Sequence, residues 1–252
     1  MQKTVDRYLP AIKKLPKDRP LTKQDLLTEH FLMIKDGTTE IYYAPHNEYI
    51  NSNAKVIIVG ITPGWNQMKA AYEQFIQSIA EGEDIESCLI QTKKAARFFG
   101  SMRRNLTSML DQCGVPEVLG IPTSSDLFGK SSDLLHTTSI IKNPVFTHGK
   151  NYNGHQPAIN SSPLLQHYAY EVFPEELAHI TSPALFIPLG KTVEQMMYKL
   201  IEEKKVSGHT YLNGFPHPSG ANGHRMKQFQ QNEKQLCQHV RKWQEYHSSS
   251  FS

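Results

Sequence analysis

A short stretch near residue 60 constrains the fold more than any other part of the sequence. Residues 55–59 (Lys-Val-Ile-Ile-Val) are almost all β-branched, which is typical of a strand buried on both faces of a parallel sheet. No strand continues easily through residues 60–64 (Gly-Ile-Thr-Pro-Gly), because Pro63 lacks an N–H group and glycine favours sharp turns. Open α/β sheets bind ligands at such a strand end. An ordinary strand-to-helix connection has the same pattern.

Strands and helices alternate through the rest of the chain. Apolar runs bounded by turn residues predict three further strands, and helical periodicity or capping residues predict the helices between them. This order predicts an α/β fold of three αβα layers around a small, about four-stranded, parallel sheet. The expected strands are 134–141, 184–190 and 210–215, and the expected helices are 68–80, 93–113 with a break near Gly100, one from Pro163, 191–204 and one from about 225 to 246.

The first 53 residues are expected to form an N-terminal helical arm that packs on a core domain of residues 54–252. Three prolines within residues 1–20 predict an irregular start. Thr22 is then expected to cap a helix over residues 23–35, and residues 39–43 form a short edge strand. A long loop rich in Gly, Asn and His, residues 147–160, is of the kind that is often functional or mobile.

Composition narrows the class of protein. The chain of 252 residues is 38% hydrophobic and has a net charge of +3, which fits one substantial core and is compatible with nucleic-acid binding without being diagnostic of it. The cysteines form no CxxC pair, and no apolar run is long enough to cross a bilayer. We therefore expect a soluble, cytoplasmic monomer without a cofactor.

Three common kinds of functional site do not match this sequence. Residues 189–192 (Leu-Gly-Lys-Thr) are similar to the end of a phosphate-binding P-loop, but Leu185 stands where that motif needs its first glycine. His209, His217 and His224 match no zinc pattern, so no metal site is expected. The GxSxG sequence of a serine hydrolase elbow is absent.

The loop of residues 216–225 (Pro-His-Pro-Ser-Gly-Ala-Asn-Gly-His-Arg) is the most informative segment. His217 lies between two prolines, so its backbone is stiff and its imidazole is aimed in one direction, as a hydrogen-bonding catalyst requires. The small residues after it precede a helix, whose N-terminus favours anions such as phosphate. A rigid connection with a structural histidine is the alternative interpretation.

Together the two turns resemble the uracil-DNA glycosylase superfamily. Residues 60–64 are similar to its first motif, Gly-x-(Asn/Asp/Ala)-Pro-(Gly/Tyr), and residues 217–222 are similar to its His-Pro-Ser-(Pro/Gly) motif. Residues 98–110, 138–142 and 189–191 are similar to the helix, the strand and the turn that this family has between the two motifs. The resemblance covers residue 54 to the C-terminus.

The resemblance implies a DNA glycosylase that flips a pyrimidine out of DNA and hydrolyses its N-glycosidic bond, in repair or in defence against phage. DNA would be the partner. His217 would donate a hydrogen bond to the departing base, Thr62 and Asn66 would position water, and Phe98, or Phe99 as second choice, would stack on the base. The remaining assignments are Gly60, Ile61, Pro63, Gly64 and Ser139 for the base, and Lys191, Ser219, Gly220, Ala221, Asn222 and Arg225 for DNA.

This sequence departs from the family at two positions. Thr62 stands where many members have an acidic or amide residue that orients water, and a threonine cannot take a proton. Ser139 stands where many have an asparagine that reads uracil, so a modified cytosine is an alternative substrate. The family's iron–sulfur branch needs four suitably placed cysteines, so no cluster is expected. The rival interpretations are a catalytically weak protein of the same fold that only binds DNA or a modified base, and an unrelated α/β enzyme that binds a nucleotide.

Overall fold

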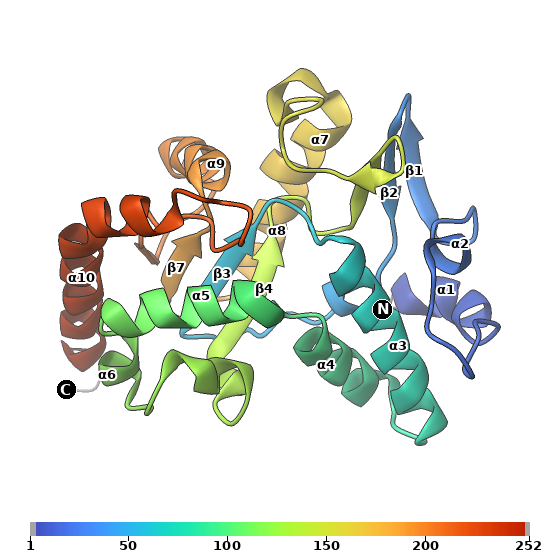
Figure 1. The fold of residues 1–252 in the computed structure, drawn as a ribbon, viewed down its shortest axis with the longest axis horizontal. Coiled ribbons are helices and arrows are strands. Elements are labelled where there is room, and N and C mark those ends of the chain that lie inside the picture. The colour runs from blue at the N-terminus through green and yellow to red at the C-terminus, as the bar shows by residue number, and fades with distance from the viewer. Residues whose placement is uncertain (1–3, 250–252) are drawn as a thin grey trace. The chain divides into compact units, whose positions relative to one another are not determined.

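The computed structural model describes residues 4–249 and has a mixed α/β fold (Figure 1). A four-stranded parallel sheet and a separate four-stranded antiparallel sheet account for its strands. The predicted class, three αβα layers around a small parallel sheet, is confirmed. The chain divides into two compact units: the first comprises the residues up to Ile50 together with Thr62–Arg97 and Ile141–Ala169, and the second comprises Asn51–Ile61, Phe98–Ile140 and the residues from Tyr170 onward.

The second unit contains the parallel sheet, whose strands lie in the order β4-β3-β7-β8. Strand β3 is the predicted run near residue 57 and is buried along its whole length, since it pairs with β4 on one side and β7 on the other. The elements of this unit are β3 (Val56–Gly60), α5 (Gly100–Gln112), α6 (Val115–Leu119), η2 (Ser124–Phe128), η3 (Ser132–Leu134), β4 (Leu135–Ser139), α8 (Phe173–Ala178), β7 (Leu185–Pro188), α9 (Lys191–Glu202), β8 (Thr210–Tyr211) and α10 (Arg225–Ser249).

Helices cover both faces of the parallel sheet. Val56 and Ile58 point to one face, where they join a hydrophobic core that α5, α6 and α10 complete. Helix α5 crosses in front of the sheet in Figure 1. On the other face, buried His136 of β4 contacts Glu176 of α8 with an Nε2–Oε1 distance of 3.1 Å. The sheet is therefore the middle of three layers, as predicted.

The first unit has its own core. Buried side chains of α1, α3, α4 and the antiparallel sheet form one cluster, in which the rings of Tyr8 and Tyr43 stack with their centroids 3.9 Å apart. The antiparallel sheet has the order β1-β2-β5-β6. The elements of this unit are α1 (Thr4–Ile12), α2 (Lys23–Leu26), β1 (Leu32–Asp36), β2 (Thr39–Tyr42), η1 (Pro45–Asn47), α3 (Trp65–Ala80), α4 (Ile85–Ala95), β5 (Val145–Thr147), β6 (Lys150–Asn151), η4 (Ile159–Ser161) and α7 (Pro163–His167). A π-helical segment, Tyr168–Val172, spans the boundary between the two units in the sequence.

The N-terminal residues are more ordered than the sequence suggested. The predicted irregular start is wrong for α1, which forms despite Pro10 because Val5, Tyr8 and Ile12 lie on one face and are buried. Thr22 does cap a helix, but this helix ends at Leu26 rather than Lys35. The residues beyond it instead form β1, since pairing with β2 overrides their helical pattern.

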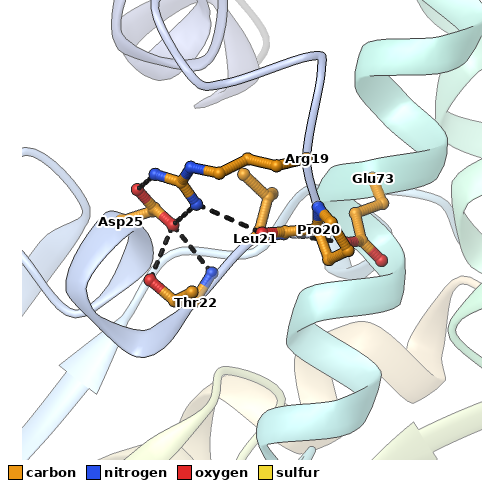
Figure 2. A network of polar contacts seen from close by, with 6 residues as sticks. All are labelled: Arg19, Pro20, Leu21, Thr22, Asp25 and Glu73. Atoms are coloured by element: carbon orange, nitrogen blue, oxygen red, sulfur yellow. Dashed lines mark hydrogen bonds and ion pairs between the residues drawn. The ribbon is translucent and has the colours of Figure 1, made fainter.

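Figure 2 shows the contacts that hold this turn. The guanidinium group of Arg19 donates to both carboxylate oxygens of Asp25 at 2.8 and 2.7 Å, and Thr22 donates to Asp25 from its backbone and its hydroxyl. These contacts hold the pKa of the Asp25 carboxyl group well below its usual range, and the hydrogen bond from Arg19 has the largest effect. The backbone N–H of Leu21 donates to Glu73 of α3 at 2.9 Å and anchors the segment.

Two other predictions for this unit are corrected. Residues 39–42 do not form an edge strand, because β2 pairs with β1 on one side and β5 on the other. The loop of residues 147–160 contributes to β5 and β6, which the sequence analysis missed. The first error arose because β5, the second partner of β2, lies about a hundred residues away and leaves no local signal, whereas β5 and β6 form a short hairpin closed by residues 148–149. No helix among residues 4–249 is long and apolar enough to cross a membrane.

Candidate functional site

Three strand ends of the second unit line one edge of the parallel sheet. Gly60 and Ser139 are partners in register at the ends of β3 and β4. The ladder continues past the strands, because Ile140 donates its N–H to the carbonyl of Gly60, and Leu189 donates to that of Val59, both at 2.9 Å. The ends of β4, β3 and β7 are thus held level, over a span of roughly 10 Å, two strand spacings.

Ser139 presents its hydroxyl at this edge. A Cβ atom added to Gly60 would lie 3.6 Å from the Ser139 Oγ, so the glycine leaves space beside that oxygen. The residue is buried, at 7% exposed. Within residues 4–249, no hydrogen bond to this hydroxyl is formed. A serine hydroxyl can both donate and accept a hydrogen bond, so Ser139 is a candidate for recognising the polar edge of a ligand.

His217 follows β8 and is held in one tautomer. The backbone N–H of Ser219 donates to its Nδ1 at 3.2 Å, so Nδ1 is an acceptor and the proton of the neutral ring is on Nε2. Burial lowers the pKa of His217 from its usual 6.5. Near neutral pH the ring is therefore an uncharged N–H donor.

Side chains fix the backbone on which His217 sits. Three successive carbonyl groups of the loop, those of residues 217, 218 and 219, each accept a hydrogen bond from a side chain. The donors are Asn222 at 3.1 Å, Asn105 of α5 at 2.9 Å and the guanidinium group of Arg225 at 2.9 Å, respectively. Asn222 and Arg225, which were expected to bind DNA, are therefore engaged in holding the loop. Asn105 was missed as a contributor, because its contact is 113 residues away in sequence.

The other predicted DNA contacts are more accessible. Lys191, Gly220 and Ala221 are exposed, and Ser219 is partly buried, its Oγ accepting from the N–H of Ala221 at 3.2 Å. A Cβ atom on Gly220 would lie 3.7 Å from the Ser101 hydroxyl at the start of α5. The loop and the N-terminus of α5 are therefore neighbours.

Gly190 packs directly against His217 and yields a testable prediction. Its φ is +85°, and an added Cβ atom would lie 3.2 Å from the His217 Cβ. We expect Gly190→Ala to cost about 1–3 kcal/mol of unfolding free energy through backbone strain and to displace the imidazole. Chemical denaturation and the NMR signals of the His217 ring nitrogens measure the two effects.

Gly208→Ala is the matched control. Gly208 has φ +84°, but an added Cβ atom would have no neighbour within 4 Å. This variant should show a similar strain without moving the His217 signals. Equal movement in both variants would show that Gly190 has no special relation to the ring.

The two adjacent phenylalanines have different environments. Phe98 is 8% exposed and belongs to the hydrophobic core of the second unit, while its carbonyl accepts from the Arg103 Nε. Phe99 is 43% exposed and precedes α5 as its N-cap residue. Of the two rings, Phe99 is thus the accessible one, although Phe98 was the first choice from the sequence.

The remaining predicted residues, Thr62, Pro63, Gly64 and Asn66, belong to the first unit, whereas Gly60 and Ile61 belong to the second. The Thr62 hydroxyl donates to the carbonyl of Asn143 at 2.8 Å and accepts from the N–H of Val145 at 3.1 Å. This hydroxyl therefore braces the segment before β5. Asn66 is exposed in the first turn of α3.

The N-terminus of α3 is capped within the first unit. The N–H of Gly64 donates to the Gln67 side chain at 3.2 Å, and the N–H of Trp65 donates to Asn151 at 3.0 Å. Asn151 also lines a polar pocket of about 800 Å³ between the β1–β2 turn and the start of α7. In the part of the chain that the structure describes, no group of three or more metal-ligating side chains forms a metal site.

Fold and site define an α/β protein whose candidate ligand site lies at the carboxyl edge of a parallel sheet. No model of a known protein family matches the chain. A relative from Bacillus subtilis (strain 168), "Uncharacterized protein YoxB", is 52% identical over 221 residues, which cover 88% of this chain and 86% of the relative. The chain belongs to the family of this YoxB protein.

Proposed function

We propose that the protein is a DNA glycosylase that acts on a flipped pyrimidine, either uracil-like or a modified cytosine. The observation that carries this proposal is the state of His217: a neutral ring, stiffly mounted, with Nδ1 occupied and the Nε2 proton available. Such a donor is suited to a base that becomes negatively charged as its bond to the sugar breaks.

The chemistry follows from this placement. As the N-glycosidic bond breaks, negative charge develops on O2 of the pyrimidine and positive charge on the sugar. The Nε2–H group of His217 would donate to O2 and stabilise the leaving base; water then attacks C1′ of the sugar, and the proton that the water loses neutralises the base anion. Ser139 would contact the opposite edge of the base, since His217 packs against Gly190 after β7, and β7 and β4 lie on opposite sides of β3. Gly60 and Ile61 lie between these two contacts and would leave space for the base.

DNA would be held outside the base pocket. Lys191, Ser219, Gly220 and Ala221 offer an exposed ammonium group and a small-residue loop that can approach phosphates closely. The test is base release from oligonucleotides that carry a panel of modified pyrimidines, read by mass spectrometry and by alkaline cleavage of abasic sites. Release of a free base supports the proposal, and intact DNA throughout the panel contradicts it.

Ser139→Asn should shift the preference of the enzyme toward uracil. An asparagine amide can pair with the O4 and N3–H of uracil, whereas serine does not distinguish uracil from cytosine. Since a base contact contributes about 1–3 kcal/mol, we expect roughly a tenfold or greater change in relative rate. Ser139→Ala, which removes the hydroxyl without adding an amide, should produce no such shift. An unchanged preference in Ser139→Asn would contradict the role of Ser139.

Phe99→Ala should weaken DNA binding by about 1–3 kcal/mol, the contribution of one stacked base. Fluorescence anisotropy with an unmodified oligonucleotide measures this loss. Tyr198→Ala removes another exposed aromatic ring, 51% exposed on α9, and should leave the affinity unchanged. Phe98→Ala should instead lower the stability, since that ring lies in the core. A loss of affinity in Phe98→Ala alone would restore Phe98 as the stacking residue.

One observation favours a second function, a DNA-binding protein with weak or no catalysis. Thr62 stands where a water-orienting residue is expected, and its hydroxyl is engaged with Asn143 and Val145. If that residue is needed for attack by water, DNA binding would persist without base release. Salt-dependent DNA affinity together with an intact base would identify this case.

A further inference from the structure

A second pocket of about 470 Å³ lies beside His217 in the same unit. This volume is within the range of small-molecule sites, about 300–1,000 Å³. One wall is a face of α9 with Glu194 and Tyr198, and the other is a face of α10 with Gln228, Asn232 and Gln235. These positions recur every three or four residues, so each set lies on one side of its helix.

A single glycine ties the two walls together. The N–H of Gly214 donates to Oε1 of Glu194 at 3.1 Å, and its carbonyl accepts from Nδ2 of Asn232 at 2.8 Å. Gly214 has φ +84°, and an added Cβ atom would lie 2.9 Å from that same Nδ2. The pocket therefore has a fixed width, and its polar atoms have set orientations.

These contacts leave a mixed set of donors and acceptors for a ligand. Oε1 of Glu194 also accepts from the Tyr198 hydroxyl at 3.1 Å, and Oε1 of Gln228 accepts from Asn222 at 3.0 Å. Among the described residues, Oε2 of Glu194 and Oδ1 of Asn232 remain as acceptors, and Nε2 of Gln228 remains as a donor.

The chemistry of the lining selects the class of ligand. An anion such as phosphate has only acceptors; Lys191 of the lining could pair with it, but the Glu194 carboxylate would repel it, so this pair of opposite charges suits a neutral ligand better. A nucleobase needs two flat apolar walls, whereas here only the α9 wall offers a flat ring, that of Tyr198, and the α10 wall is polar. A sugar hydroxyl both donates and accepts, which matches the set, and the exposed ring of Tyr198 offers a surface for the apolar face of a sugar.

We propose that this pocket binds a neutral hexosyl ring. The ring could be a free sugar or one carried by a modified base of DNA. The second source rests on the proposed function, because His217 borders this pocket. The first source is independent of that function.

Saturation-transfer NMR and calorimetry test the proposal with three probes: free glucose, a duplex with glucosylated 5-hydroxymethylcytosine, and the same duplex without glucose. We expect free glucose to bind, or the glucosylated duplex to bind at least tenfold more tightly than the duplex without glucose. Binding of the free sugar identifies the first source, and a preference confined to the duplex identifies the second. Failure of both overturns the proposal, as does binding of inorganic phosphate or an unmodified nucleotide in its place.

Gln235→Leu and Gln230→Leu form a matched pair on α10. Both residues are exposed, but only Gln235 lines the pocket. Gln235→Leu should reduce sugar binding at least fivefold, and Gln230→Leu should leave it unchanged; equal effects would contradict the assignment. Base release from unmodified substrates is scored separately, so the hexosyl site and the glycosylase activity can each fail alone.

Discussion

His217→Ala is expected to lower single-turnover base release by about 100- to 1,000-fold while DNA affinity stays nearly unchanged. This magnitude is typical for the loss of one preorganised donor to a developing negative charge. The variant removes the Nε2–H group and leaves the loop carbonyls with their partners Asn222, Asn105 and Arg225. Rates on a duplex substrate and anisotropy on the same duplex measure the two quantities.

His224→Ala is the control for this experiment, because His224 is an exposed histidine seven residues along the same segment. It should release base at the wild-type rate. A loss of DNA affinity as large as the loss of rate in His217→Ala would indicate that the imidazole binds DNA rather than the leaving base.

The pH profile tests the same donor without a mutation. Burial lowers the pKa of His217 below 6.5, so the ring is neutral above that pH and activity should be level there. Activity and the stability of the loop should fall as the pH drops through the lowered pKa, because a proton on Nδ1 would oppose the N–H of Ser219. An acidic optimum would contradict a neutral donor.

Phe229→Ala is expected to destabilise the second unit by about 3–5 kcal/mol, the usual cost of removing a buried aromatic ring. Phe229 of α10 is fully buried and meets Phe215 edge-on, with ring centroids 6.3 Å apart. Since Phe215 immediately precedes the Pro216–His217 segment, the cavity left by the missing Phe229 ring would also make the position of the His217 imidazole less rigid.

Urea unfolding followed by Trp243 fluorescence measures this loss, in a Trp65→Phe background so that only the second unit reports. Trp243 lies in the same core cluster as Phe229. Met226→Ala changes a residue of the same helix that is 46% exposed, and should alter stability by no more than about 0.5 kcal/mol. Similar losses in both variants would argue against Phe229 as a core anchor.

Much of the second unit was predictable from local patterns. The run around Ile57 had to be a strand buried on both faces, and β3 is one. The predicted break near Gly100 is present, since α4 ends at Ala95 and α5 begins at Gly100. The last strand is shorter than expected and ends at Tyr211, because the residues after it turn toward the His217 loop. These features follow from periodicity and turn chemistry within a few residues.

The first unit was less predictable, for a physical reason. Residues 32–36 carry apolar side chains that suit a helix or a strand, and the decision came from pairing with β2, which in turn pairs with β5 about a hundred residues later. A local window around β1 and β2 does not contain β5 or the hydrogen bonds that β5 provides to β2.

The sequence by itself determined the parallel α/β core and singled out His217 between two prolines, because backbone restriction and burial patterns are local properties. Only the tertiary structure decided which atoms are available to contact a ligand. It assigned Nδ1 of His217 to Ser219, the Thr62 hydroxyl to Asn143 and Val145, and Arg225 to the loop backbone, and it placed Phe98 in the core while Phe99 stays exposed. Hydrogen-bond partners and solvent exposure depend on segments that meet only when the chain has folded.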